Sequence, residues 1–285
     1  MRPPEGIRLK RLVATAGLLT LLAALSPPLA AQWPGYPTRR VPRTADGKPD
    51  LTAPTPRTAD GKPDLSGIWE PTWMIQFRRQ TPQSSPTPGG PPVATFADVG
   101  AGFKEGLPLQ PWAAELLKTR KEQHSKDNPD AHCLPMGLMQ FHLHPQPRKI
   151  IQTPDLMVML YEGNAGIRQI YTDGRSLPTN DPQPWWYGYS VGRWDGDTFV
   201  VETSGFRDGG WLDINGSPLT DAGKMIERYR RLNFGVMEID VTIDDPKAYT
   251  KPFTVRVDHR IIVDTEMIEF ICNENNRDPE HMIGK

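Results

Sequence analysis

Charged and aromatic side chains alternate along one predicted strand, which makes that strand the part of the chain best suited to chemistry. Glu227, Tyr229 and Arg231 are two residues apart and therefore share one face of the strand. Arg228 and Arg230 share the other face. Unless the strand lies at an exposed edge, one set of charges points into the protein, where a buried charge costs several kcal/mol unless it is paired. The pattern therefore predicts a polar interior.

A carboxylate beside a tyrosine or a histidine in such an interior could perform acid–base chemistry, for example an isomerisation, cyclisation or elimination. The candidate catalytic residues are Glu227, Asp213, His259 and Tyr229. The candidate ligand-binding residues lie on or beside predicted strands and are Arg168, Asp173, Arg175, Trp185, Tyr187, Tyr189, Trp211, Arg228 and Arg231. The alternative is a structural ion-pair network that fixes the register of the strands. The aromatic residues fit either the mouth of a pocket for a planar or hydrophobic ligand or an ordinary core.

His142 and His144 are the candidate metal ligands. In an extended chain both imidazoles would lie on one face, at the spacing that metal sites in β-sheets use. The sequence specifies no third ligand, and Pro145 and Pro147 favour the alternative, a solvated polar loop at the surface. No phosphate-binding loop, dinucleotide fingerprint, serine-hydrolase elbow or zinc-protease motif occurs, so no cofactor is expected.

The strands that must position these residues begin near Lys149. They are predicted over residues 156–161, 167–171, 187–194, 198–203, 225–232, 236–243, 254–263 and 266–272. Asp195 and Gly196 form the strongest short hairpin signal, and residues 236–243 alternate apolar and polar side chains, as a strand with one buried face does. Seven or eight strands without crossover helices predict an all-β antiparallel meander that closes into a barrel.

One amphipathic helix is predicted from Pro111, with Trp112, Leu116 and Leu117 on its apolar stripe. We expect this helix to cap or plug the barrel, and Asn128-Pro129 to stop it. The whole β-rich region, residues 64–285, is expected to form a single domain.

A proline-rich arm precedes that domain and contains an identical tandem duplication. Residues 43–51 (RTADGKPDL) recur as residues 57–65. Two polar copies are too few for a repeat architecture. We therefore interpret residues 32–63 as a disordered linker, of which only the second copy runs into structure.

Residues 1–31 have the pattern of an export signal. Arg8, Lys10 and Arg11 form a basic segment, the apolar run from Leu12 follows, and small residues precede Gln32, where a signal peptidase would cut. The apolar run of about 14 residues is shorter than the roughly 20 that span a bilayer. The sequence predicts a periplasmic or secreted protein with no stable membrane insertion after cleavage.

Charge and cysteine content restrict the partners and the compartment. Without the signal, 29 basic and 33 acidic residues remain, a net charge of −4, which argues against a nucleic-acid-binding surface. The expected partner is a small-molecule ligand, and the oligomeric state stays open.

Cys133 and Cys272 have a single possible pairing, whose loop of about 140 residues would contribute roughly 5 kcal/mol in the chain-entropy model. Two buried free thiols are the alternative, but an oxidising compartment favours the disulfide.

Two resemblances bear on the fold. Residues 64–69 (DLSGIW) resemble the opening of a lipocalin-type barrel, whose first strand begins Gly-x-Trp. The resemblance implies a lipocalin-like barrel in which Trp69 closes the floor beneath a basic residue from a late strand. Arg256 or Arg260 fits that position, since arginine can stack on an indole face.

The second resemblance covers nearly the whole mature chain. It is carried by residues 60–69 (DGKPDLSGIW), 172–175 (TDGR), 192–203 (GRWDGDTFVVET), 227–231 (ERYRR) and 242–246 (TIDDP). These motifs resemble a family of uncharacterised exported bacterial proteins, which implies export and fold but no mechanism. Members of that family often carry a histidine where this chain has residues 217–220 (SPLT).

These patterns favour an exported small-molecule-binding barrel with a polar and aromatic lumen. A cofactor-independent lyase, isomerase or hydrolase that acts in the barrel is one alternative, and a structural envelope protein is another. A carboxylate and a histidine or tyrosine that converge in an open cavity would favour the enzyme. A barrel filled by its own side chains would favour the structural protein.

Overall fold

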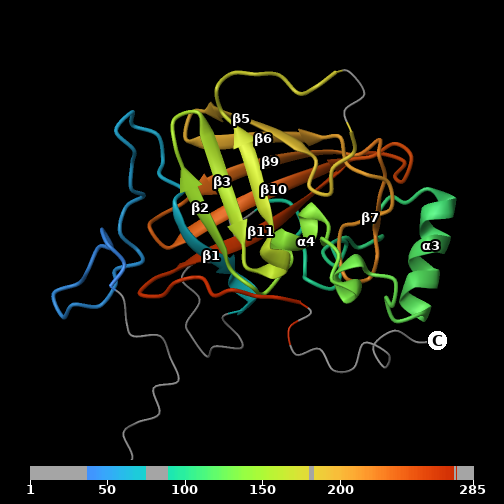
Figure 1. Cartoon of the computed structure of the whole chain (residues 1–285), viewed down its shortest axis with the longest axis horizontal. Helices are drawn as coiled ribbons and strands as arrows, with labels where there is room; N and C mark the ends of the chain where they lie inside the picture. The colour runs from blue at the N-terminus through green and yellow to red at the C-terminus, as the bar shows by residue number, and fades with distance from the viewer. Residues whose placement is uncertain (1–36, 75–88, 180–182, 273, 275–285) are drawn as a thin grey trace, which may run out of the picture. The chain divides into compact units, whose positions relative to one another are not determined.

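Nine strands close into a barrel in the order β1-β11-β10-β9-β6-β5-β4-β3-β2 among the residues that the structure describes (Figure 1). This computed structural model describes residues 37–74, 89–179, 183–272 and 274, and those from Thr38 onward belong to one unit. The barrel strands are β1 (Gly67–Pro71), β2 (Arg148–Gln152), β3 (Leu156–Tyr161), β4 (Ile167–Tyr171), β5 (Tyr189–Asp195), β6 (Thr198–Ser204), β9 (Lys224–Arg231), β10 (Val236–Asp244) and β11 (Phe253–Ile262). Two short strands, β7 (Gly210–Trp211) and β8 (Pro218–Leu219), form a separate pair. The predicted all-β barrel is confirmed.

One pair of barrel strands is parallel, which the predicted antiparallel meander did not include. A closed ring with an odd number of strands cannot alternate direction throughout, so at least one neighbouring pair must be parallel. Here that pair is β4 and β5, which meet over only two register positions, Ile170 with Ser190 and Tyr171 with Val191. This β4–β5 seam has the fewest paired residues of any strand pair in the barrel.

The strands present alternating faces to the barrel interior, as the sequence predicted. In β9 the side chains of Met225, Glu227, Tyr229 and Arg231 are buried, whereas those between them are exposed or half-buried. One set of charges in β9 therefore does point inward. The Asp195-Gly196 signal is also confirmed, because β5 and β6 pair up to Asp195 and Thr198, and Gly196 adopts a positive φ of 59° in the turn.

The predicted last strand, residues 266–272, is wrong. This segment is irregular, and the apolar side chains of Ile268, Phe270 and Ile271 in it are 38–48% exposed. The physical reason is that β11 has no free edge: β10 pairs with one side of it and β1 with the other.

The helix that packs against the barrel is not the one predicted. α3 (Pro111–Glu122) does begin at Pro111, but Trp112 is 47% exposed and Ala113 is its buried residue. α4 (Leu138–Leu143) is buried throughout and lies against the barrel strands, whereas α3 stands apart beyond β7 (Figure 1). The described part of the chain also contains three short 3-10 helices: η1 (Thr72–Met74), η2 (Pro129–His132) and η3 (Gly163–Ala165). No helix among the described residues is long and apolar enough to cross a membrane.

The two copies of the duplicated segment fold alike, in a region predicted to be a linker. Arg43 donates to the carbonyl oxygen of Gly47, and Arg57 donates to that of Gly61, at 3.1 and 2.8 Å. Each arginine also pairs with an aspartate at a turn next to the barrel, Arg43 with Asp264 and Arg57 with Asp197. Such exposed ion pairs contribute little stability each. Val41, Leu51 and Ala53 of the arm also pack against the core, so the arm is an ordered part of the domain rather than a disordered linker.

Cys133 and Cys272 form the expected disulfide, which ties the end of η2 to the irregular segment after β11. Replacing both cysteines with serine should lower the free energy of unfolding by about 2–5 kcal/mol, because the unfolded chain regains the entropy of an open loop of 139 residues. Urea unfolding with and without reductant measures the effect. Equal stability of the native protein in both conditions would contradict it.

Candidate functional site

A hydrogen-bonded network of buried polar side chains lies inside the barrel. Glu227 on β9 pairs with Arg168 on β4, whose Nη1 donates to Glu227 Oε1 at 2.9 Å. The same carboxylate oxygen lies 2.7 Å from His142 Nε2 and accepts a hydrogen bond of 2.7 Å from the Tyr229 hydroxyl. All four side chains belong to residues that are at most 2% exposed. α4 contributes His142, so side chains from α4, β4 and β9 meet at one carboxylate.

Arg168 extends this network toward β5 and β6. Its Nε donates to Ser190 Oγ at 3.1 Å and its Nη2 donates to Thr203 Oγ1 at 2.9 Å. The two hydroxyls are also 3.0 Å apart, within hydrogen-bond distance. The guanidinium of Arg168 thus donates hydrogen bonds to side chains from three other strands, β5, β6 and β9.

The electrostatics of the network keep Glu227 ionised. Burial disfavours the charged carboxylate, but the positive charge of Arg168 and the hydrogen bonds from His142 and Arg168 outweigh it and hold the pKa of Glu227 well below its usual range. Burial lowers the pKa of His142, and the nearby arginines Arg148 and Arg168 add to that effect, so the imidazole is neutral at pH 7 and donates through Nε2. Burial together with the charge of Glu227 raises the pKa of the Tyr229 hydroxyl.

A second buried cluster adjoins the first. Arg148 on β2 lies with its Nη1 2.9 Å from His259 Nε2, and that nitrogen is 2.8 Å from the carbonyl oxygen of His142. Burial lowers the pKa of Arg148 to about 10, which leaves it charged at neutral pH. The pKa of His259 lies well below its usual value because of burial and the charge of Arg148. His259 is therefore a neutral partner of Arg148 and does not touch Glu227.

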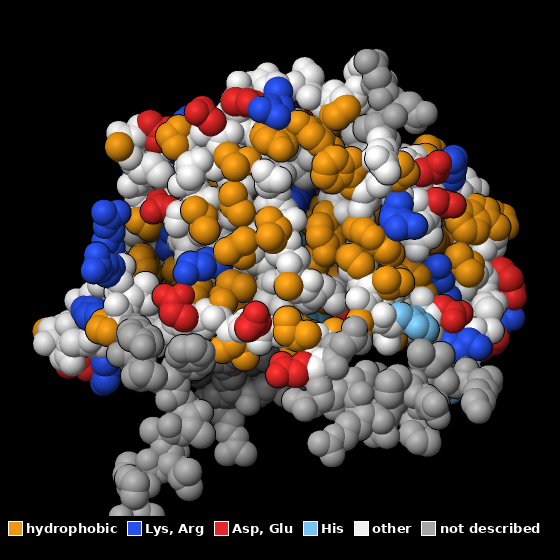
Figure 2. Space-filling model, in the orientation of Figure 1, with side chains coloured by type: hydrophobic (Ala, Val, Ile, Leu, Met, Phe, Trp, Pro, Cys, Tyr) orange, Lys and Arg blue, Asp and Glu red, His pale blue; other side chains and the backbone are white. Residues whose placement is uncertain are grey.

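A cavity of about 490 Å³ opens at the β4–β5 seam. Five aromatic residues line it: Tyr171, Trp185, Trp186, Tyr187 and Tyr189. Hydrophobic side chains gather across the middle of the molecular face that carries β3 (Figure 2). We call this site the seam cavity. Its volume falls within the range of small-molecule sites.

Arg168 and Ser190 connect the seam cavity to the buried network, because both residues line the cavity and both belong to the network. Tyr187 makes a second connection: its ring packs edge-on against Phe141 of α4, with ring centroids 5.1 Å apart. Gly188, also in the lining, has a positive φ of 65°, and a Cβ there would come within 2.6 Å of Thr203. The cavity wall and the network therefore share Arg168 and Ser190.

Two arginines stack on aromatic rings at the cavity. The Arg207 guanidinium lies 4.3 Å from the ring centroid of Trp186, and that of Arg175 lies 3.9 Å from the centroid of Tyr171. Arg175 also pairs with Asp173 and donates to the Tyr189 hydroxyl at 3.1 Å. The predicted pair Asp173 and Arg175 thus lies beside the cavity residues, on the surface.

The remaining predicted site residues lie elsewhere. Trp211 is buried in β7 under Arg120, whose guanidinium lies 4.2 Å from its ring centroid. Asp213 is buried in the loop after β7, where it accepts hydrogen bonds from Val99, Gly216 and Ser217. Burial raises the pKa of Asp213.

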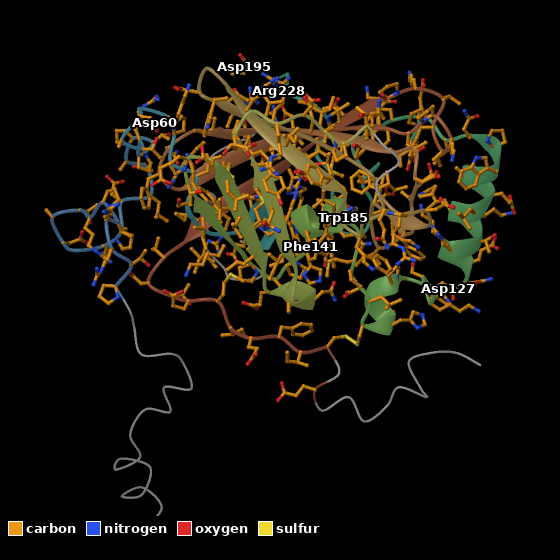
Figure 3. The ribbon with its side chains drawn as sticks, turned by 45° about the horizontal axis from the view of Figure 1, so that its top comes forward. Asp60, Asp127, Phe141, Trp185, Asp195 and Arg228 are labelled. Atoms are coloured by element: carbon orange, nitrogen blue, oxygen red, sulfur yellow. A yellow bond between two sulfur atoms is a disulfide. The ribbon has the colours of Figure 1, made fainter. Side chains whose placement is uncertain are left out.

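Arg228 and Arg231 also lie away from the seam cavity. Arg228 pairs with Asp195 on the outer surface at 2.9 Å (Figure 3). Arg231 lies 4.9 Å from the ring centroid of Trp69. It therefore holds the position for which Arg256 and Arg260 were the candidates. Those two side chains point away from the interior and pair with Asp240 and Glu70 instead.

The predicted metal ligands do not share a face. Because α4 is helical, residues two apart point in nearly opposite directions. His142 points into the barrel, whereas His144 packs edge-on against Phe96 with ring centroids 5.2 Å apart. No cluster of three or more metal-ligating side chains occurs in the described part of the chain. The positions of His142 and His144 therefore do not support the predicted metal site.

Several residues of the site were not singled out from the sequence: Arg148, Tyr171, Ser190, Thr203, Arg207 and the network role of His142. Strand alternation carried a usable signal for two of them, since Ser190 and Thr203 face inward in β5 and β6. Nothing local marked His142, because its position depends on a helix of only six residues.

Comparison with protein-family models, with curated proteins and with solved structures finds no match to this chain.

Proposed function

We propose that this protein is exported and binds a small, planar and partly hydrophobic molecule in the seam cavity. The observation that carries the proposal is a cavity lined by five aromatic residues at the one parallel joint of the barrel wall among the described strands. Aromatic walls around a few placed polar groups are typical of small-molecule sites. Arg168 and Ser190 supply such groups at the edge of the network.

Binding is better supported than catalysis. A carboxylate, a histidine and a tyrosine do converge within hydrogen-bond reach, but Glu227, His142 and Tyr229 are at most 1% exposed and do not line the seam cavity. Arg168 also stabilises the ionised carboxylate, which makes Glu227 a weak base. The network is best explained as the structural support of the cavity wall.

A purely structural role is less well supported, because it does not account for a cavity of about 490 Å³ at the β4–β5 seam that five aromatic residues line. Trp185 is 50% exposed. A ring of that size left half in water at a concave site suits a contact with a ligand.

Export to the periplasm or the medium is supported by the signal pattern of residues 1–31 and by the disulfide, which persists in oxidising compartments. Native mass spectrometry of the protein from its own cells tests both parts of the proposal. We expect a chain that begins at Gln32 and a small molecule that is released on denaturation. A chain that retains residues 1–31 would contradict export.

Trp185→Ala should weaken binding of the neutral probe 2-naphthylmethanol by about tenfold, because one stacking surface is lost. Trp112→Ala is the matched control: Trp112 is 47% exposed, against 50% for Trp185, but lies on α3. It should leave the affinity unchanged. Isothermal titration calorimetry measures both. No binding by the wild-type protein, or equal affinity in all three proteins, would overturn the seam cavity as the binding site.

A further inference from the structure

The charged residues that line the seam cavity, among those that the structure describes, are both arginines. Arg168 and Arg207 belong to the lining, and none of the described aspartates or glutamates does. The charge of Arg168 is matched by Glu227 behind the wall. Arg207 makes no ion pair with any carboxylate of the described residues, in contrast to neighbouring surface arginines such as Arg175 and Arg193, which pair with Asp173 and Glu202.

Arg207 is also held in place. Its backbone N–H donates to the carbonyl oxygen of Trp185 at 3.0 Å, and the N–H of Trp185 donates to that of Gly205 at 2.9 Å. Its guanidinium stacks on Trp186. Stacking uses the face of the guanidinium and leaves its N–H edge free to bind an acceptor in a bidentate manner.

The aromatic walls do not favour a cationic ligand. A cage of rings can bind a cation through the faces of the rings. Here one face of Trp186 is covered by Arg207 and one face of Tyr171 by Arg175, whose charge Asp173 matches. A cationic ligand would meet the positive charge of Arg207, whereas an anionic one could bind this guanidinium, which has no carboxylate partner among the described residues.

We infer that the ligand of the seam cavity is a planar aromatic anion, such as an aryl carboxylate, whose rings stack among the aromatic walls and whose carboxylate binds Arg207. This inference rests on the proposed function. It makes Arg207 the residue that determines specificity, and Trp185 a residue that contributes affinity without regard to the ligand's charge.

Three probes with the same ring system test the inference: 2-naphthoate, 2-naphthylmethanol and 2-naphthylmethylammonium. By calorimetry, the wild-type protein should bind the anion about tenfold more tightly than the neutral probe, and the cation most weakly. Arg207→Gln should remove the preference for the anion and leave the affinity for the neutral probe unchanged. Arg193→Gln is the matched control, because Arg193 is an exposed arginine on β5 outside the cavity lining.

The outcomes separate the two proposals. Equal affinity for the anion and the neutral probe, unaffected by Arg207→Gln, would overturn the choice of an anion, while a loss on Trp185→Ala would still support the cavity as the site. If none of the three probes binds, or if Trp185→Ala changes no affinity, the proposed function fails and the inference fails with it.

Discussion

Glu227→Gln is expected to lower the free energy of unfolding by about 3–5 kcal/mol, because it leaves the Arg168 guanidinium buried without a compensating charge. The residue is fully buried, and its carboxylate accepts from Arg168 and Tyr229 and lies 2.7 Å from His142 Nε2. The variant keeps the shape of the side chain, so the loss reports the charge. Chemical unfolding followed by tryptophan fluorescence measures it.

Removing both members of the ion pair is the control. Arg168→Met combined with Glu227→Gln should cost less than the sum of the two single variants, because no unpaired charge then remains inside the barrel. Strict additivity would contradict a coupled pair. A Glu227→Gln protein that folds normally but loses turnover of a bound molecule would instead favour the enzymatic alternative.

The difference in stability between the wild-type and Glu227→Gln proteins should depend on pH, because the pKa of Glu227 changes on folding. The pKa of Glu227 is lowered in the folded protein, so its contribution to stability is complete above the unfolded value of 4.5 and is lost as the pH falls below it. The stabilities of the wild-type and Glu227→Gln proteins should therefore converge below about pH 4.5. The buried neutral histidines, among them His144 with its pKa lowered to about 4 by burial, destabilise both proteins as the pH falls below 6.5. The comparison therefore uses the difference between the two proteins.

Much of the barrel could be predicted from the sequence, because strand alternation and turn residues are local signals. The inward set of β9 follows from its period of two, and the β5–β6 hairpin follows from Asp195 and Gly196. The disulfide followed from the cysteine count. Trp185, Tyr187 and Tyr189 were predicted to bind a ligand, and all three line the seam cavity together with Trp186.

What could not be predicted depends on contacts between distant segments. The place of His142 in the network is set by a six-residue helix packed against a barrel that closes only when β1 joins β11. The seam follows from the odd number of barrel strands, which is nine because seven of the eight predicted strands form and β1 and β2 join them. Neither a short helix nor the strand pair that closes a barrel has a local sequence pattern, because tertiary packing determines whether each of them forms.

Trp69→Ala is expected to lower the free energy of unfolding by about 3–5 kcal/mol, the usual cost of truncating a large buried aromatic side chain. Trp69 is 0% exposed, its Nε1 donates to the carbonyl oxygen of Leu65 at 3.0 Å, and β1 pairs on both sides of it with Ile261 and Arg148. Thermal and urea unfolding measure the loss. Trp112→Ala, at an exposed position, is the control and should change stability little.

The arginine above Trp69 makes the test more specific. Arg231 stacks on the indole and donates to backbone carbonyl oxygens of Asn233 and Phe234, and burial lowers its pKa to about 10. If Trp69 and Arg231 close the barrel together, Trp69→Ala and Arg231→Met should be coupled in a double-mutant cycle, because each variant removes the other's stacking partner. An unchanged melting temperature for Trp69→Ala would remove its role in closing the barrel. A large loss without coupling would leave Trp69 as a core residue whose neighbour Arg231 acts only through its hydrogen bonds.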